Sequence, residues 1–161
     1  MKFDNKNEVV KVQMLKLIYL LVVAVFIAFA FSSDLWNYVD NSTGVSKWLF
    51  GIVLFSIYLV YYIFHIVKRS SYVYFDDDGS KVIIRFYNLN PFDSKKNSYE
   101  IPKDQLVDYT FHRSLFGIRQ HITIVRRMTS SNAQYPPFSI SLLPEAQKKK
   151  LFVALDFHCK K

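Results

Sequence analysis

Two uncharged stretches decide the fold of this chain: LIYLLVVAVFIAFAFSS at residues 17–33 and WLFGIVLFSIYLVYYIF at residues 48–64. Neighbouring apolar residues extend the expected helices to about 13–33 and 48–67. A helix rises about 1.5 Å per residue, so roughly 20 residues cross the ~30 Å hydrocarbon layer of a bilayer. Backbone groups in lipid must be bonded internally, and two stretches cannot close a barrel. The pattern therefore predicts two membrane-spanning helices.

Two other interpretations of the apolar stretches fit less well. The first stretch has a basic start and small residues, as a cleaved signal peptide has, but its apolar core is too long and a second span follows at once. A buried helical hairpin in a soluble protein is disfavoured because both stretches are apolar on all sides.

The charged flanks predict how the helices cross the membrane. Lysines precede the first span and Lys68–Arg69 follow the second, whereas the connecting segment 34–47 is slightly acidic. The positive-inside rule then places both termini in the cytoplasm and segment 34–47 outside. Trp36 and Trp48 are expected at the outer interface, and Lys16 at the inner one.

The spans lack the groups that transport requires. Between Leu17 and Ser33, and between Trp48 and Phe64, no acidic or basic side chain occurs. Ion pathways and proton relays usually need such groups, so the helices are expected to act as an anchor.

The remaining sequence indicates one small basic domain. The chain has 161 residues, a net charge of +8 and a single cysteine, Cys159, so no internal disulfide can form. From Lys68 onward, 16 basic residues stand against 9 acidic ones. We expect a hairpin unit at 1–69 and a cytoplasmic domain at 70–161.

Alternating apolar and polar residues predict that this domain is mostly β. The expected strands are antiparallel and lie at 72–75, 82–86, 98–101, 107–111, 118–128 and 138–142. A helix then begins at Pro144, and one of its faces carries Leu151, Phe152, Leu155 and His158. The predicted fold class is a membrane α-helical hairpin followed by an antiparallel β domain with one C-terminal helix.

Three short motifs resemble the bacterial pleckstrin-homology-like domain family. They are IPKDQL at 101–106, SLFG at 114–117, and FSI at 138–140 with PEA at 144–146. The resemblance covers about 72–158 and implies an antiparallel barrel or sandwich capped by one helix. It also implies a bacterial inner-membrane protein, because many members carry a two-helix hairpin before the domain. The family has no shared catalytic residues to transfer.

Cross-strand register brings two histidines together. Pairing Phe111 with Ile122 and Tyr109 with Ile124 directs these four side chains inward, and it also pairs His112 with His121 on the outer face. Two such imidazoles could bind a transition metal or sense pH. No further ligand is evident nearby, so two exposed strand histidines are the simpler interpretation.

Other chemistry-bearing residues give no site. Asp76–Gly79 lacks the spacing of a calcium loop and is expected to be a solvated turn. His65 has no histidine partner in the first span with which to hold haem. His158 and Cys159 are neighbours on a helix and do not face each other. No cofactor is expected, and the chain is not expected to be an enzyme.

The basic residues indicate binding partners. Lys68–Arg69 are expected at the lipid headgroups, and Lys148–Lys149–Lys150 form a candidate basic surface for a partner. Nucleic acid is disfavoured because no reader motif is present. We expect a non-enzymatic, membrane-anchored interaction module that binds proteins or anionic lipid. The alternatives are an accessory subunit of a larger membrane complex and, less favoured, an enzyme or transporter.

Overall fold

The computed structural model of the protein describes residues 1–31, 36–37, 44, 46–90, 95–128 and 131–159. The chain divides into two compact units. One unit, here called the helix pair, is Val10–His65, and the other, here called the β unit, joins Met1–Val9 to Ile66–Lys161. Most of the predicted external segment 34–47 lies outside the described residues.

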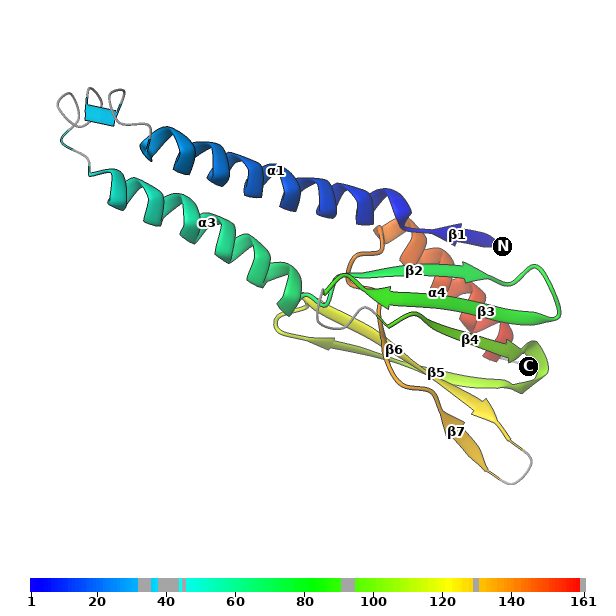
Figure 1. Ribbon diagram of the computed structural model, residues 1–161. Helices are drawn as coiled ribbons and strands as arrows, with labels where there is room; N and C mark the ends of the chain where they lie inside the picture. Colours follow the sequence, from blue (N-terminus) through cyan, green and yellow to red (C-terminus); the bar gives the residue numbers. More distant parts are fainter. Residues whose placement is uncertain (32–35, 38–43, 45, 91–94, 129–130, 160–161) are drawn as a thin grey trace. The chain divides into compact units, whose positions relative to one another are not determined.

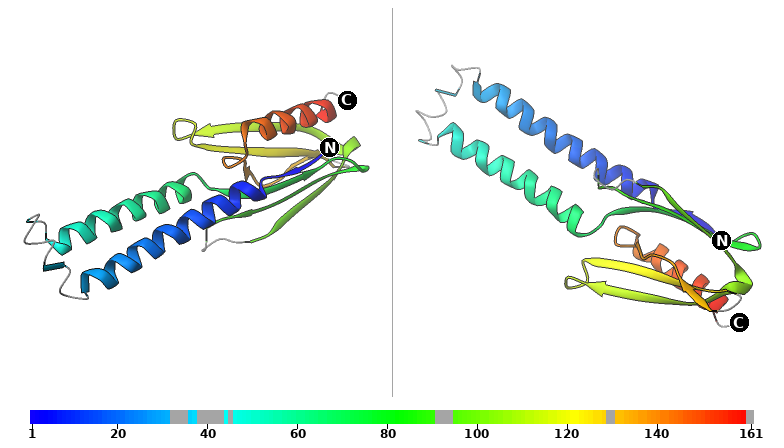
Figure 2. Two further views of the ribbon diagram at one scale, coloured as in Figure 1. Left: turned by 90° about the horizontal axis from the view of Figure 1, so that it is seen from above. Right: turned by 60° about the horizontal axis from the view of Figure 1, so that its bottom comes forward.

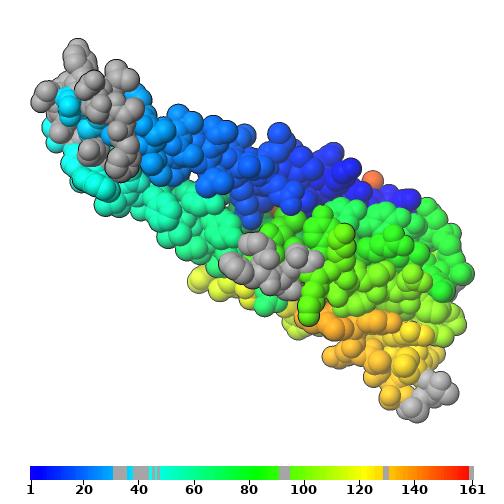
Figure 3. Space-filling model, in the orientation of Figure 1, coloured from blue at the N-terminus to red at the C-terminus, as the bar shows by residue number. Residues whose placement is uncertain are grey.

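The helix pair consists of two long helices side by side, α1 (Lys6–Phe31) and α3 (Lys47–Val67) (Figure 1). Their side chains meet where the rings of Phe26 and Phe50 lie 5.1 Å apart. Figure 3 shows the outer surface of both helices. Large apolar side chains are exposed on it, and Trp48 and Val60 are 65% and 67% exposed. Long apolar helices with exposed side chains indicate insertion into a membrane. The predicted second span matches α3, whereas α1 begins at Lys6, ahead of the predicted start at about residue 13.

The first sheet includes a strand that lies before the first helix. Its order is β1 (Lys2–Asp4), β2 (Ser71–Asp76), β3 (Lys81–Asn88) and β4 (Asn97–Pro102), all antiparallel. Phe3 pairs with Phe75, and their rings stack at 5.3 Å. The predicted boundary grouped residues 1–9 with the helices, but these residues belong to the β unit.

The second sheet follows a short 3₁₀ turn at Lys103–Gln105. Strand β6 (Arg119–Arg127) pairs with β5 (Leu106–Ser114) on one side and with β7 (Asn132–Gln134) and β8 (Phe138–Ser139) on the other. The strand predicted at 138–142 is thus shorter than expected. The chain turns after Ser139, where Leu143 N–H donates to Ile140 O, because it must reach the start of the last helix.

Helix α4 (Glu145–Cys159) closes the core between the two sheets. Figure 2 shows it lying against β5 and β6. Leu151 and Leu155 are fully buried, together with Ile84 of the first sheet and Ile122 of the second. The ring of Phe152 packs on those of Tyr109 and Phe111 in β5. The predicted fold class is therefore confirmed: an apolar helical hairpin, antiparallel sheets and one C-terminal helix.

Candidate functional site

A buried asparagine joins the segments at which the chain enters α1 and leaves α3. Asn5 is 2% exposed, and its backbone carbonyl accepts the first helical bond from Val9 N–H. Its side-chain amide donates to Ser71 O at 2.9 Å, and its Oδ1 accepts from Val73 N–H at 2.8 Å. Asn5 N–H also donates to Val73 O at 3.3 Å. Because Asn5 precedes α1 and Ser71 follows α3 closely, these bonds tie both chain segments into one sheet.

The junction between α3 and β2 is equally well bonded. Arg69 has a φ of +49°, and its N–H donates to Ile66 O at 3.0 Å, which ends the helix in a left-handed turn. The Ser71 hydroxyl then donates to Arg69 O, and Leu89 N–H donates to Ser70 O. The residues between α3 and β2 are therefore held in the β unit by hydrogen bonds.

We call the end of the β unit that carries Asn5 and Ser71 the near end, and the end that carries Met1 and Asp76–Gly79 the far end. The turn between β5 and β6 lies at the near end (Figure 1). There the Arg119 guanidinium donates from Nε to the carbonyl of Val67, the last residue of α3, at 3.2 Å. A contact between a strand of the second sheet and the end of α3 was not apparent from the sequence.

Basic residues gather at the near end. Lys68 is half-buried, and burial lowers its pKa, as does the nearby Lys148, while Glu8 opposes the shift. Arg69 and Arg113 are exposed. That Lys68 and Arg69 face lipid headgroups stays a prediction.

The two strand histidines lie together at this end, as their register predicts. His112 pairs with His121 across β5 and β6, and their rings stack with centroids 5.5 Å apart. Burial, and then the charges of His112, Arg119 and Arg69, hold the pKa of His121 below its usual value of 6.5. Within the described residues no group of three or more candidate ligands could hold a metal ion. The pair is therefore two stacked imidazoles beside arginines, which is a cationic surface when they are protonated.

The basic run on α4 is only partly accessible. Lys148 is 7% exposed and forms an ion pair with Glu145 at 2.7 Å. That hydrogen bond also lowers the pKa of Glu145. Lys149 and Lys150 are exposed, so the partner surface expected at Lys148–Lys149–Lys150 is reduced to two lysines.

The far end carries three consecutive aspartates, Asp76–Asp78. Asp77 contacts the Met1 ammonium, and its Oδ2 lies 3.3 Å from His158 Nε2. Burial alone would raise the pKa of Asp77, but its hydrogen bonds with the Met1 ammonium and His158 outweigh burial and lower it. Asp76 accepts hydrogen bonds from Tyr74 and from the backbone of Asp78. These carboxylates are thus engaged in protein contacts.

The single thiol is held in its protonated form. Burial, with Asp108 and Asp156, raises the pKa of Cys159 to about 11. Nearby, Tyr109 donates a 2.7 Å hydrogen bond to Asp156, and burial together with this bond raises the Tyr109 pKa to about 12. A thiol of this kind is a weak nucleophile near neutral pH. The geometry therefore gives no support to a His158–Cys159 catalytic pair.

In the helix pair, the predicted interface residues take different positions. Trp36 is 6% exposed, and its ring packs on those of Phe26 and Phe50. Trp48 is exposed, as expected of an interfacial ring. The Lys16 ammonium lies 5.1 Å from the centre of the Tyr62 ring. Their depths in a bilayer stay predictions.

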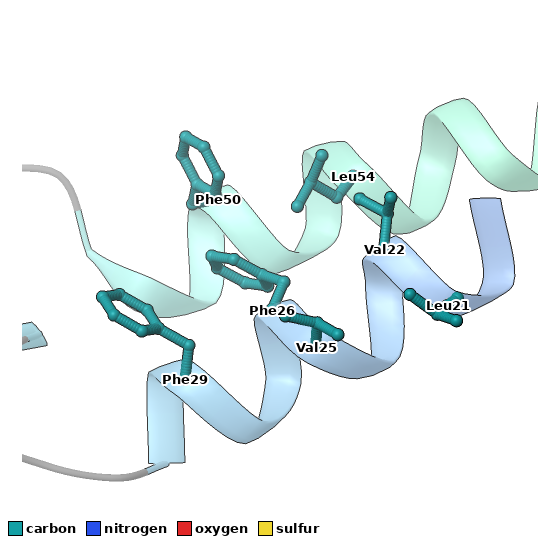
Figure 4. Close-up of a pocket in the computed structure, with 7 residues that line it drawn as sticks. All are labelled: Leu21, Val22, Val25, Phe26, Phe29, Phe50 and Leu54. Atoms are coloured by element: carbon teal, nitrogen blue, oxygen red, sulfur yellow. The ribbon is translucent and has the colours of Figure 1, made fainter. Parts of the chain in front are cut away.

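Apolar grooves run along both sides of the helix pair near Phe26. One, of about 510 Å³, is shown in Figure 4, and the other is about 330 Å³. Gly51 lines the second groove, and a Cβ atom there would sit 3.7 Å from the Phe26 ring. The seven residues that line the first groove are Leu21, Val22, Val25, Phe26, Phe29, Phe50 and Leu54. Such surfaces suit acyl chains or the apolar helices of another protein.

Comparison of the chain with family models, with curated proteins and with solved structures gives no match.

Proposed function

We propose that this protein is a non-enzymatic, membrane-anchored module that presents a pleckstrin-homology-like domain at the inner face of a bacterial cytoplasmic membrane. There the domain binds anionic lipid headgroups or protein partners. The observation that carries the proposal is the set of bonds made by Asn5 with Ser71 and Val73. They hold the sheet within a few residues of both helix ends, which supports an orientation in which the near end faces the bilayer surface.

The pairing of β1 with β2 supports a hairpin with both ends on one side of the membrane. Strand β1 precedes α1 and strand β2 follows α3, and hydrogen-bonded strands cannot be separated by a bilayer. The lysines before the first uncharged stretch and the Lys68–Arg69 pair support a cytoplasmic location for that side.

The charge distribution supports an anionic partner at the near end. Lys68, Arg69, Arg113 and Arg119 lie there, with Glu8 near Lys68 and Glu145 near Arg113. The far end carries Asp76–Asp78 together with Lys103 and Arg127. Basic residues beside an anionic leaflet contribute about 1 kcal/mol each. Aspartates turned away from the leaflet avoid repulsion, which supports the same orientation as the Asn5 bonds.

The family resemblance is supported by the positions of its motif residues. In the stretch at 101–106, Ile101 and Leu106 are both buried, and the four residues between them turn the chain from β4 to β5. The succession of two antiparallel sheets and one C-terminal helix agrees with the pleckstrin-homology-like arrangement.

The lipid-binding part of the proposal is testable in nanodiscs that hold the full chain. We expect slower amide hydrogen exchange at residues 106–121 in discs with phosphatidylglycerol than in discs of phosphatidylcholine alone. Arg113→Gln should remove most of this difference, because it deletes a near-end charge. Arg127→Gln deletes an equal charge from the opposite end of the same hairpin and should leave the difference intact. Equal exchange in both kinds of disc would rule out headgroup binding.

The grooves on the helix pair favour one second candidate, an accessory subunit of a larger membrane complex. Helices that pack on other subunits need apolar grooves of this kind, although acyl chains fill them equally well. Purification in a gentle detergent separates the two. Stoichiometric membrane partners favour the subunit, and a monodisperse chain alone speaks against it.

A further inference from the structure

The turn between β5 and β6 exposes apolar side chains that the fold does not use. Phe116 is 107% exposed and Leu115 is 46% exposed, and neither belongs to the core cluster of the β unit. The flanking positions are cationic or titratable: His112 and Arg113 precede the turn, and Arg119 and His121 follow it.

The backbone of this turn is strained by the residues it contains. Three consecutive residues have positive φ: Leu115 at +53°, Phe116 at +55° and Gly117 at +87°. Two hydrogen bonds close the turn. Gly117 N–H donates to Ser114 O, and Ile118 N–H donates to Leu115 O. Glycine and asparagine adopt this left-handed conformation readily, whereas leucine and phenylalanine do not. Two large apolar residues at such positions cost stability, and neither packs on the core of the β unit. Their side chains therefore point to a role outside the fold.

The position of the turn identifies what it meets. Arg119 is the first residue of β6, and its guanidinium bonds the carbonyl of Val67, where the candidate span ends. Phe116 at the tip is three residues from Arg119, or roughly 10 Å along an extended chain and less in a turn. The interfacial layer on each side of the hydrocarbon is roughly 5–8 Å thick. A residue next to the end of a span thus lies within reach of that layer.

We propose that Leu115 and Phe116 insert into the interfacial layer of the bilayer that holds α1 and α3, while Arg113 and Arg119 contact the phosphates around them. This inference rests on the proposed membrane-facing orientation of the β unit and names the element that makes the contact. A loop with an apolar tip and cationic flanks matches the gradient from headgroup phosphate to acyl chain. The insertion adds a third attachment point to the two helices.

The insertion is testable with a fluorescent label on the full chain. In a Cys159→Ser background, Phe116→Cys carries an environment-sensitive dye, and Asn132→Cys carries the same dye on exposed strand β7, opposite Arg127 at the other end of β6. In nanodiscs with one chain each, we expect a blue-shifted emission at position 116 and at least two-fold quenching by lipids with a nitroxide near the headgroup. The dye at position 132 should show neither effect.

Three outcomes would overturn the inference. Equal quenching at both positions would show that the turn has no special contact with lipid. Unshifted emission at position 116 would leave the turn for a soluble partner. A blue shift that lipid nitroxides do not quench, and that needs several chains in each disc, would assign the turn to a second copy. The hydrogen-exchange difference between anionic and neutral discs is a separate readout of the basic near end. If that difference persists while position 116 stays unquenched, only the insertion fails.

Discussion

Replacement of Asn5 by alanine should loosen the β unit, although Asn5 lies next to a membrane helix. The substitution removes one side-chain donor and one acceptor, and it leaves Ser71 O and Val73 N–H without these partners. Both are backbone groups of residues that are almost completely buried. A buried polar group left unsatisfied costs about 1–3 kcal/mol, so two such groups cost about 2–6 kcal/mol, and water that enters brings the cost toward the lower figure. Helix α1 loses little directly, because the Asn5 amide bonds β2 and not the helix.

Hydrogen exchange of the full chain in detergent measures this effect where it occurs. A loss of 2 kcal/mol corresponds to about thirty-fold faster exchange of the β2 amides at residues 71–76, if these amides exchange through opening of the sheet. Asn7→Ala is a matched control, because Asn7 is exposed on the first turn of α1. We expect the control to change the exchange of β2 by less than about two-fold. If Asn5→Ala accelerated exchange no more than Asn7→Ala does, the Asn5 bonds would not hold the sheet to the helix ends.

Three further predictions test other parts of the structure. Gly51→Ala should be tolerated because the added Cβ makes an ordinary contact with Phe26. Gly51→Ile should overpack the helix pair and lower its free energy of unfolding by about 1–3 kcal/mol. The fluorescence of the two tryptophans measures this unfolding. Cys159 should react with iodoacetamide at pH 8 about a hundred-fold more slowly than an ordinary thiol of pKa 9.0. The reason is that a pKa of about 11 leaves little thiolate until the pH rises well above neutral. A rate equal to that of a free thiol would contradict the burial of Cys159. The double substitution Leu115→Asn with Phe116→Gly should raise the unfolding free energy in detergent by about 1–2 kcal/mol, because both new residues accept positive φ. A loss of stability would instead assign the two apolar side chains a structural role.

Local sequence patterns predicted most of the architecture because their causes are local. Alternation in β5 and β6 set the register, so the pairing of Phe111 with Ile122 and of His112 with His121 is confirmed. A slip by one residue would turn Phe111 away from the core, because successive side chains of a strand point to opposite faces. The helix at 145–159 followed from Pro144 and the apolar face that contains Leu151 and Leu155.

Other features escaped sequence analysis because their causes are distant in the chain. Strand β1 is only three residues long, which is too short for an alternating pattern, and α1 begins two residues after it ends. Lys148 belongs to a basic run that the sequence predicted to be exposed. The fold buries its side chain, and its ammonium forms an ion pair with Glu145. Arg119 appeared to be an ordinary strand residue until its contact with Val67 placed it beside the end of α3.

The amino-acid sequence by itself determined that the protein has two apolar helices and one small antiparallel domain. Lipid admits only long apolar helices whose backbone groups are bonded internally, and alternation alone orients the side chains of a strand. Only the tertiary structure decided that Asn5 bonds Ser71, 66 residues away, and that the β5–β6 turn lies beside the end of α3. Such contacts depend on how distant segments meet, and no local period encodes that meeting. The proposed work of the protein at the membrane surface depends on these contacts.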